Sequence, residues 1–548
     1  MNASDEIIDC LTRNGIGTIF GIPGKQTLPL NKSVSERDDI QFVMARHETN
    51  VSHQAWGYAE TSGEMAATVV IPGPGDMNAM NGLKNALNDC TPLLHIAVET
   101  EPNVRGGDGI HETPPDTYDN VVKENVTVET PQSTVAELER AIEIARTPPT
   151  GPVRVGIPKD FVPADVEVAA RESRPTTAPP EPPEAKIRTA SERLANASSP
   201  VIVAGGGVRA ANATEELLSV AESLDAPVAT TYKGKGTVPE DHPLATSVLC
   251  GGASAELKAC LENADAVLGV GTDFDAVWTK QWAYDLPAEL IHVTLEPEHV
   301  GRGYEPSVAI VADAGPTLAM LEDDLAERSI ASEDGESRAR RVREGVADRL
   351  AELADDAEPP LSSATALEAL REGLPRETIV TADAGGSRIW TLVSFPVYEP
   401  RDYVNPGSWA SMGVGIGAAI GAKTANPDQP VAAFIGEGGL LMCLEELHTL
   451  VAEELDVTVF VFNNDDYAII SEEAERSYDL EQGEYGWADA PLDVATIAEG
   501  MGLRTERAET QAEIIDIARE TLDTGPTLVE IPTDPYEPQA GEFMAGEH

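Results

Sequence analysis

A glycine-rich turn and the polar strand end that follows it are the first features of this sequence that could do chemistry. Residues 435–439 read Ile-Gly-Glu-Gly-Gly, and the next apolar run ends at 463–466 in Asn-Asn-Asp-Asp. A glycine turn that leads into a helix exposes backbone N–H groups to an anion, typically a phosphate. Neighbouring strand ends would bring the Glu437 carboxylate close to the Asn464 amide oxygen, and such oxygen ligands suit Mg2+. The residues predict a diphosphate bound with Mg2+, with an ordinary strand-to-helix turn as the alternative.

The elements that must position these residues alternate along the whole chain. Short β-branched apolar runs are separated by longer amphipathic stretches, and the clearest runs are 67–71, 93–98, 201–204, 266–270, 431–435 and 457–462. Continuous apolar runs are typical of strands that are buried on both faces, as in parallel sheets covered by helices. We therefore expect an α/β protein with three doubly wound domains and mainly parallel sheets, in which ligands bind beyond the carboxyl ends of the strands.

The domain limits follow from two linker-like stretches. A proline-rich segment covers 171–184, and an acidic segment from about 322 to 360 contains a break at 333–337. Prolines interrupt continuous helices and central strands. The predicted domains are 1–168, 187–325 and 358–548.

Composition restricts the partners and the setting. Asp and Glu number 94 against 38 Lys and Arg, which gives a formal net charge of −56. Such a chain would repel nucleic acid. The acidic residues are spread along the chain, which favours a halophilic source with a salty cytoplasm that screens self-repulsion. We see no run of about 18 apolar residues that could span a membrane and no signal segment, so we expect a cytoplasmic protein.

The cofactor region resembles that of the thiamine diphosphate enzyme family, which includes acetolactate synthase, benzoylformate decarboxylase and pyruvate decarboxylase. The family motif is Gly-Asp-Gly followed after some two dozen residues by Asn-Asn, and this chain has Gly436-Glu-Gly438 followed by 463–464. The resemblance implies that Glu437, Asn464 and the backbone oxygen of Asp466 hold Mg2+. It also implies that Gly436, Gly438, Gly439 and Asn464 contact the cofactor. Glu437 departs from the family Asp, so either the loop shifts or the metal binds less tightly.

The resemblance covers all three domains and is greatest with acetolactate synthase-like large subunits. Ordered matches in the N-terminal domain are Phe-Gly-Ile-Pro-Gly at 20–24, Arg-His-Glu at 46–48, Gly-Tyr-Ala at 57–59, Gly-Pro-Gly at 73–75, Asn78, Gly82-Leu83, Asp89 and Pro92.

Glu48 is the residue on which this interpretation depends most. The family uses the matching glutamate to hydrogen-bond N1′ of the cofactor's aminopyrimidine, which favours the imino tautomer and lets the cofactor's own amine deprotonate C2. The alternative is a helix-start Glu that is favourable to the helix dipole. The family site lies between two subunits, so we expect a homodimer or homotetramer in which Glu48 faces the 436–466 site of a partner chain.

Two further segments resemble cofactor contacts in the third domain. Residues 381–390 match a segment whose Gly and small polar residues reach the diphosphate, which implicates Gly385, Gly386 and Ser387. Met412, ahead of a helix rich in small residues, matches the bulky apolar side chain that holds the cofactor bent. The alternatives are an ordinary loop for the first segment and simple core filling for Met412.

The middle domain carries motifs reminiscent of the FAD-binding domain of acetolactate synthases. This chain departs from them in having Asp273 where those enzymes usually place Arg, and Leu-Cys-Gly-Gly at 249–252 instead of Met-His-Gly. We therefore prefer a purely structural middle domain, and FAD is the alternative.

The reaction type is suggested by what is missing. Pyruvate decarboxylases place a glutamate where this chain has Ile470, next to Ile469, and the active-site His of benzoylformate decarboxylase is replaced by Ile71. His111 lies where acetolactate synthases have Gln, and it is either an acid near neutral pH or an ordinary loop His. These features favour an acetolactate synthase-like carboligase or decarboxylase of a 2-keto acid.

Lys25 replaces the Gly that acetolactate synthases carry directly after Pro-Gly. We predict that Lys25 either pairs with a second anionic group on the substrate or faces solvent at the mouth of the site. A decarboxylase of such a dianion and a non-catalytic homologue with poor cofactor binding remain alternatives. A nicotinamide dehydrogenase is weakened by the lack of a clear Gly-x-Gly-x-x-Gly motif.

Overall fold

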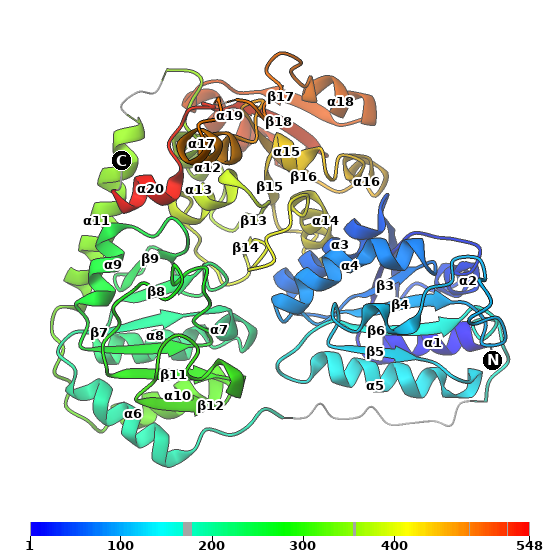
Figure 1. Cartoon of the computed structure of the whole chain (residues 1–548), viewed down its shortest axis with the longest axis horizontal. Coiled ribbons are helices and arrows are strands. Elements are labelled where there is room, and N and C mark those ends of the chain that lie inside the picture. The colour runs from blue at the N-terminus through cyan, green and yellow to red at the C-terminus, as the bar shows by residue number, and fades with distance from the viewer. Residues whose placement is uncertain (1, 168–177, 355–357, 482, 523, 547–548) are drawn as a thin grey trace.

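The computed structural model describes residues 2–167, 178–354, 358–481, 483–522 and 524–546. Within these residues the strands form three sheets of six strands, and each pair of neighbouring strands is parallel. Figure 1 shows the sheets as three separate layered units, each covered by helices on both faces. The prediction of three doubly wound α/β domains is confirmed.

The first sheet has the strand order β2-β1-β3-β4-β6-β5. Its strands are β1 Thr18–Gly21, β2 Gln41–Met44, β3 Ala67–Val70, β4 Leu94–Glu99, β5 Glu124–Thr127 and β6 Val153–Pro158. The accompanying helices are α1 Ala3–Arg13, α2 Leu28–Ser35, α3 Glu48–Ser62, α4 Pro74–Asn88 and α5 Thr134–Arg146, with the 3-10 turns η1 Pro115–Tyr118 and η2 Pro131–Ser133.

The second sheet has the order β12-β11-β10-β7-β8-β9. Its strands are β7 Pro200–Ala204, β8 Val228–Thr231, β9 Ala245–Leu249, β10 Ala266–Val270, β11 Leu290–Thr294 and β12 Val308–Val311. Its helices are α6 Glu184–Asn196, α7 Gly206–Ala210, α8 Thr214–Leu224, α9 Ala255–Glu262 and α10 Ala314–Leu325, with the 3-10 turn η3 Pro297–His299.

The third sheet has the order β14-β13-β15-β16-β18-β17. Its strands are β13 Ile379–Ala382, β14 Tyr403–Val404, β15 Val431–Gly436, β16 Val457–Asn463, β17 Arg504–Arg507 and β18 Thr527–Pro532. The helices are α12 Ser363–Gly373, α13 Gly386–Ser394, α14 Gly415–Ala425, α15 Glu437–Leu440, α16 Glu446–Ala452, α17 Ala468–Tyr478, α18 Val494–Met501, α19 Gln511–Thr521 and α20 Ala540–Ala545.

The two predicted linkers have different outcomes. Residues 171–177 of the first lie outside the described residues, and 178–183 form neither helix nor strand before α6 begins. The second contains α11, a helix over Gly335–Ala354 that packs against β9 and α9. All three sheets fall inside the predicted ranges 1–168, 187–325 and 358–548, whose limits stay a prediction.

The N-terminal and C-terminal domains meet where α3 crosses α14. A Cβ atom on Gly421 would lie 1.9 Å from the backbone oxygen of Gln54, and one on Gly57 would lie 2.3 Å from the backbone oxygen of Ala418. Glycine on both helices therefore lets their backbones approach closely. This contact explains the small-residue composition of 414–422, and it ties the first domain to the third at the level of the predicted site.

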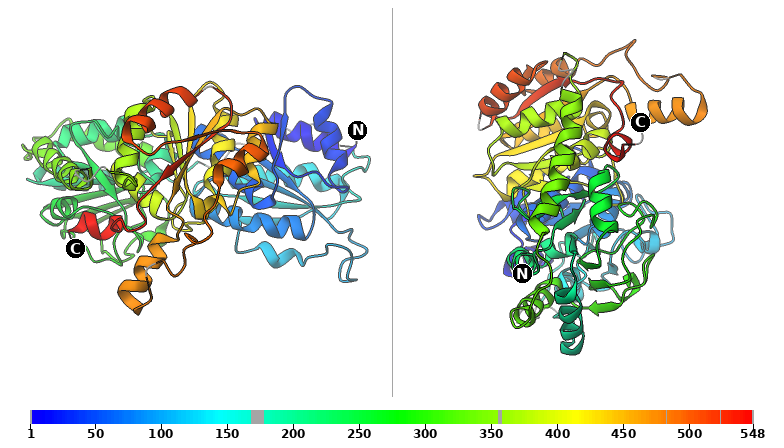
Figure 2. Two further views of the ribbon diagram at one scale, coloured as in Figure 1. Left: turned by 90° about the horizontal axis from the view of Figure 1, so that it is seen from above. Right: turned by 90° about the vertical axis from the view of Figure 1, so that its left-hand side faces the viewer.

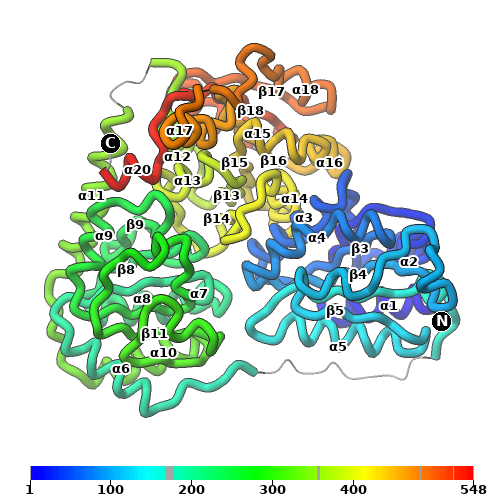
Figure 3. Tube along the Cα trace, in the orientation of Figure 1, coloured from blue at the N-terminus to red at the C-terminus, as the bar shows by residue number. Residues whose placement is uncertain are grey.

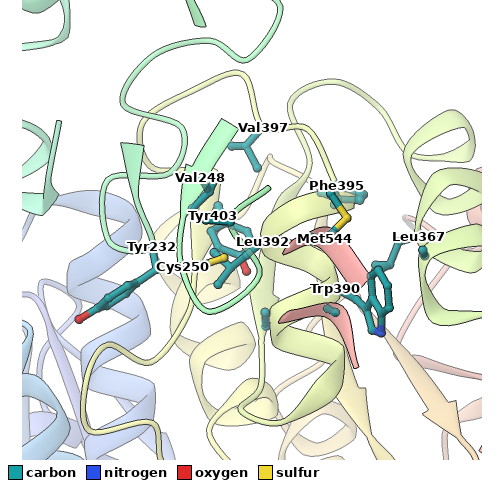
Figure 4. Packing of buried hydrophobic residues seen from close by; sticks show 14 of the residues in the cluster. Tyr232, Val248, Cys250, Leu367, Trp390, Leu392, Phe395, Val397, Tyr403 and Met544 are labelled. Carbon is teal, nitrogen blue, oxygen red and sulfur yellow. The ribbon is translucent and has the colours of Figure 1, made fainter. Parts of the chain in front are cut away.

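The middle and C-terminal domains share one hydrophobic cluster. Figure 4 shows Tyr232, Val248 and Cys250 of the middle domain beside Leu392 and Tyr403 of the C-terminal domain, and all five belong to the same buried cluster. At the chain's end, α20 packs against α11 and α13, as the tube in Figure 3 shows. In the view from above in Figure 2, the C-terminal domain lies over the other two. The C-terminal domain is therefore packed against both of its neighbours.

None of the described helices is both long enough and apolar enough to cross a membrane.

Candidate active site

The carboxyl ends of β15 and β16 bring Glu437 and Asn464 together, as their sequence positions predicted. The two strands pair in parallel, with Gly436 opposite Phe462. The backbone N–H of Asp466 donates to both side chains, at 3.0 Å from Glu437 Oε1 and 3.1 Å from Asn464 Oδ1. Two oxygen ligands of the kind that Mg2+ prefers therefore converge on one point.

Glu437 is buried, with 3% of its surface exposed. Burial raises the pKa of Glu437 to about 7, and hydrogen bonds from backbone N–H groups, including that of Asp466, oppose this rise. A bound cation would favour the charged form. The described residues contain no group of three or more His, Cys, Asp or Glu side chains that could hold a metal. Mg2+ would therefore need Glu437, Asn464, a backbone oxygen and oxygens of the diphosphate, which is the donor set that the family resemblance implies.

The glycine turn itself is tightly packed on one side. A Cβ atom on Gly438 would lie 2.5 Å from ring atom Cε1 of Tyr467, and one on Gly439 would lie 3.1 Å from Cγ of Asp383. A Cβ atom on Gly436 would lie 3.9 Å from its nearest neighbour, the backbone oxygen of Phe462. Gly438 and Gly439 thus let the turn approach its neighbours, and Gly436 leaves room at the strand end.

Gly385, Gly386 and Ser387 form the start of α13, beside the same strand ends. Gly385 is the N-cap and has φ +106°, and no atom lies within 4 Å of the position of a Cβ there. A Cβ on Gly386 would lie 3.4 Å from Cδ1 of Ile469. The unobstructed amino end of a nine-residue helix fits a phosphate group. The residues at these strand ends therefore fit a diphosphate.

Met412 lies in a half-buried loop before α14 that is tied to the N-terminal domain of the same chain. Asn81 on α4 donates from Nδ2 to Ser411 Oγ at 2.7 Å and accepts at Oδ1 from Trp409 Nε1 at 2.8 Å. Gly413 has φ +78°, and a Cβ there would lie 2.9 Å from Cβ of Met442. The loop conformation on either side of Met412 is therefore restricted.

Glu48 is the first residue of α3 and is half-buried. Asn78 Nδ2 donates to Glu48 Oε2 at 3.0 Å, and Glu48 Oε1 lies 3.1 Å from the position of a Cβ on Gly75. Because Gly75 has no side chain, the Glu48 carboxylate can lie close to the start of α4. Asn78 holds one carboxylate oxygen, and the other has no hydrogen-bond partner among the described residues.

Lys25 and His111 lie near the same turn. A Cβ on Gly24 would lie 2.2 Å from Cγ2 of Ile71, while a Cβ on Gly73 would lie 2.6 Å from the backbone oxygen of His111. Lys25 is exposed and forms no ion pair with a described residue. His111 has φ +64°, and its buried Nδ1 lacks a partner in the described structure. His111 also lines a cavity of about 470 Å³ with Arg105, Arg154 and Tyr118.

The predicted residues thus form two groups in the chain. Glu437, Asn464, Asp466 and the two glycine turns surround the strand ends of the third sheet, whereas Glu48, Lys25 and His111 surround residues 71–75 of the first. Among the described residues no hydrogen bond joins Glu48, Lys25 or His111 to residues 436–466.

The middle domain offers a different explanation for its glycines. A Cβ on Gly205 would lie 2.2 Å from the backbone oxygen of Gly271, so the turns after β7 and β10 pack backbone to backbone. Asp273 and Asp275 follow at the same sheet edge, and burial raises the pKa of both. Two acids beside a closed glycine turn fit the phosphates of a flavin dinucleotide poorly.

Sequence reasoning left Asp383, Asn81 and Glu446 without a role. Asp383 directly follows β13, the same strand-end placement that identified Glu437, so this signal was present in the sequence. Asn81 and Glu446 contact segments far away in the chain, and only the packing of α4 and α16 across the domain contact reveals them.

Three models of thiamine pyrophosphate (thiamine diphosphate) enzyme domains match this chain. The N-terminal TPP binding domain matches residues 1–120, the central domain 187–321 and the C-terminal TPP binding domain 383–531. The large subunit of acetolactate synthase isozyme 1 from Escherichia coli is 31% identical over 97% of this chain and 94% of that protein. The chain belongs to the thiamine pyrophosphate enzyme family.

Two other relatives extend the similarity. The acetolactate synthase large subunit of Corynebacterium glutamicum is 29% identical over 95% of this chain and 85% of its own length. The chloroplastic acetolactate synthase of Arabidopsis thaliana is 27% identical over 96% of this chain and 81% of its own length. The predicted resemblance to acetolactate synthase-like members of the thiamine pyrophosphate enzyme family is therefore confirmed.

Proposed function

We propose that this thiamine pyrophosphate enzyme uses thiamine diphosphate and Mg2+ to decarboxylate a 2-keto acid and join the product to a second keto acid. The observation that carries the proposal is the convergence of Glu437 and Asn464 on the N–H of Asp466, beside the open glycine start of α13. When bound, the cofactor supplies an electron sink for the carbanion left by decarboxylation.

The chain's own residues divide the remaining tasks. Glu437, Asn464 and the backbone oxygen of Asp466 would hold the metal, and the turns 385–387 and 436–439 would hold the diphosphate. Glu48 holds a proton at its free oxygen Oε1, while Asn78 orients the carboxylate. Met412 would pack against the bound cofactor. Ile470 stands where pyruvate decarboxylases place a glutamate, and its neighbour Ile469 lies beside the 385–387 turn. An apolar side chain at position 470 supplies no proton to the reaction product and so favours carboligation over aldehyde release.

A second copy of the chain completes the site in this proposal. Glu48 and Glu437 belong to separate groups within one chain, and several exposed apolar side chains lie next to residues that contact Glu48 or the Met412 loop. Met77 precedes Asn78, Trp409 bonds to Asn81, and Met442 packs near Gly413. An apolar surface of this kind suits contact with another subunit. We propose a homodimer or homotetramer in which the partner subunit's Glu48 reaches the 436–466 site.

The test combines cofactor binding with product analysis. Calorimetric titration should show that the protein binds thiamine diphosphate with Mg2+, and a keto-acid panel scored by mass spectrometry should show CO2 and a condensed acetohydroxy acid. Glu48→Gln should keep binding but lose about 100-fold or more in turnover, because an amide cannot exchange the proton. An aldehyde as sole product would make the chain a simple decarboxylase, and absence of binding would make it a non-catalytic homologue.

Lys25 favours a substrate with a second anionic group. Lys25 is exposed and follows Gly24, which lies against Ile71. Ile71 also lies against Gly75, and Gly75 lies beside Glu48. Lys25→Gly should therefore slow turnover of a sulfonate, phosphonate or dicarboxylate keto acid by about 10-fold relative to pyruvate, the usual cost of one charged hydrogen bond. The matched control is Lys258→Gln, an exposed lysine on α9, which should change neither rate. An unchanged preference in Lys25→Gly would eliminate the idea.

The middle domain is structural in this proposal. Gly205 and Gly271 serve backbone packing, and Asp273 stands where acetolactate synthases usually place Arg. Purified protein should therefore show no flavin absorbance after incubation with FAD and gel filtration.

A further inference from the structure

Asp383 is a buried acid that none of the tasks above uses. It directly follows β13 and is fully buried. Its Oδ1 accepts from the N–H of Gly413 at 2.9 Å and from the N–H of Ala384 at 2.6 Å, and its Oδ2 accepts from the N–H of Gly415 at 3.0 Å. One carboxylate therefore holds two backbone N–H groups that flank Val414, at the end of the Met412 loop.

Asp383 also contacts the other two segments of the site. A Cβ on Gly439 would lie 3.1 Å from Cγ of Asp383, so the 436–439 turn passes directly over the carboxylate. In the chain, Asp383 is separated from Gly385 by one residue. All three segments to which we assign cofactor binding, 385–387, the Met412 loop and 436–439, thus meet at this side chain.

An acid suits this place for a chemical reason. An ionised carboxylate only accepts hydrogen bonds, and it accepts up to about four. An Asn side chain would turn an NH2 donor towards one of the backbone N–H groups. Burial raises the pKa of Asp383 to about 6, and hydrogen bonds from Gly415, Gly413 and Ala384 oppose that rise. The fold therefore keeps a carboxyl group in a costly position where only an acceptor can satisfy its neighbours.

The Met412 loop needs such an anchor. Gly413 has φ +78°, and the preceding residues 408–410 are exposed. The loop therefore leaves solvent and enters α14 through a left-handed residue. The hydrogen bonds to Asp383 hold the backbone N–H groups of this entry, and Thr381 Oγ1 donates to the backbone oxygen of Gly415 at 2.9 Å.

We infer that Asp383 is a positioning residue that keeps Met412 and the two diphosphate-binding turns in fixed mutual register. It touches neither substrate nor reacting atoms, and its effect on catalysis passes through Met412 and the two turns. The inference rests on the proposed function for what those segments bind.

The first experiment uses the protein without cofactor, so it is independent of the proposed activity. In Asp383→Asn, the amides of Gly413 and Gly415 should exchange with deuterium roughly 10-fold or more faster than in the parent, because a charged hydrogen bond is lost. Asp402→Asn is the matched control, because Asp402 is a buried carboxyl at the amino end of β14, bonded to Gln429. It should leave exchange at 413 and 415 unchanged.

The second experiment uses the protein loaded with thiamine diphosphate and Mg2+. Turnover at saturating cofactor should fall by about 10- to 100-fold in Asp383→Asn, while KM for the keto acid changes little, because orientation and not substrate binding is lost. Exchange of the bound cofactor's C2 proton with D2O should slow in parallel.

The outcomes are distinct. Faster exchange at 413 and 415 together with the loss of turnover supports the inference, whereas unchanged exchange in Asp383→Asn overturns it, whatever the turnover. If the variant does not fold, amide exchange in the parent protein provides the test. Its amides at 413 and 415 must exchange far more slowly than those of exposed Ser408 and Trp409, and equal rates overturn the inference. A parent that binds no cofactor would instead refute the proposed function and leave the amide result standing.

Discussion

At the residue scale, Glu446 is a buried carboxyl at the contact between the N-terminal and C-terminal domains. Its Oε1 accepts from the N–H groups of Arg46 and His47, at 2.8 and 3.1 Å, which cap the start of α3 just before Glu48. Its Oε2 accepts from Gln54 Nε2 and Thr449 Oγ1. Burial outweighs these hydrogen bonds and raises the pKa of Glu446 to about 7. Glu446 therefore helps to fix the position of Glu48, and its ionisation at higher pH lowers the stability of the folded protein.

The raised pKa of Glu446 predicts that the protein loses stability as pH rises. A carboxyl whose pKa is higher in the folded state than in the unfolded state binds its proton more tightly when folded. The free energy of unfolding is therefore highest below the unfolded pKa and falls as pH rises to about 7, by up to about 3 kcal/mol. Glu446→Gln removes this dependence, so its stability relative to the parent should rise between about pH 5 and pH 8.

Chemical denaturation at several pH values measures this difference. Buried Oε1 of Gln54 has no partner among the described residues, so rotation of that amide can accommodate the new NH2 group. Glu368→Gln is the control, because Glu368 is exposed on α12. A difference between Glu446→Gln and the parent that does not vary with pH would contradict the assignment.

At the element scale, the crossing of α3 and α14 depends on the absence of a side chain at Gly421. A Cβ there would lie 1.9 Å from the oxygen of Gln54 and 2.6 Å from the nitrogen of Tyr58, and backbone atoms cannot move aside individually. Gly421→Ala should therefore destabilise the protein by about 3 kcal/mol, at the upper end of overpacking costs.

Gly500 on α18 is the matched control for this prediction. No atom lies within 4 Å of a Cβ at Gly500, so Gly500→Ala should stabilise the protein slightly through helix propensity. Urea denaturation measures the free energy of unfolding of both variants and of the parent protein. Equal stability of the two variants would show that the helices do not approach as closely as described.

At the scale of the whole molecule, the separation of Glu48 from Glu437 predicts complementation between defective chains. Glu48→Gln and Glu437→Ala should each be inactive. Co-expressed in equal amounts, they should recover about one quarter of the parent activity, because half of the dimers are mixed and each mixed dimer contains one intact site. Activity per mole of protein, with each variant assayed alone as control, measures this. No recovery would place the whole site within one chain.

Net charge also acts at this scale. The formal charge of −56 is carried by acids distributed over all three domains. The halophilic source inferred from this charge stays a prediction, as does the cytoplasmic location expected from the lack of a signal segment and of a long apolar run.

The sequence by itself determined the sheet-forming runs, the parallel α/β class and the positions of Glu437 and Asn464 at adjacent strand ends. These features are local, since a continuous apolar run followed by glycine or a polar residue specifies a buried strand and its end. The resemblance to a known family added Glu48, Met412 and the 385–387 turn, because their motifs occur in this sequence in the order that the family shows.

Only the tertiary structure decided which backbone N–H groups Asp383 and Glu446 satisfy, how Asn81 ties α4 to the Met412 loop, and that α11 packs as a helix within a predicted linker. These contacts join segments far apart in the chain, so their geometry depends on how closely α3 and α14 approach and on how the three domains pack. A sequence shows that an acid is present at a strand end. The partners that compensate its burial are fixed by the fold.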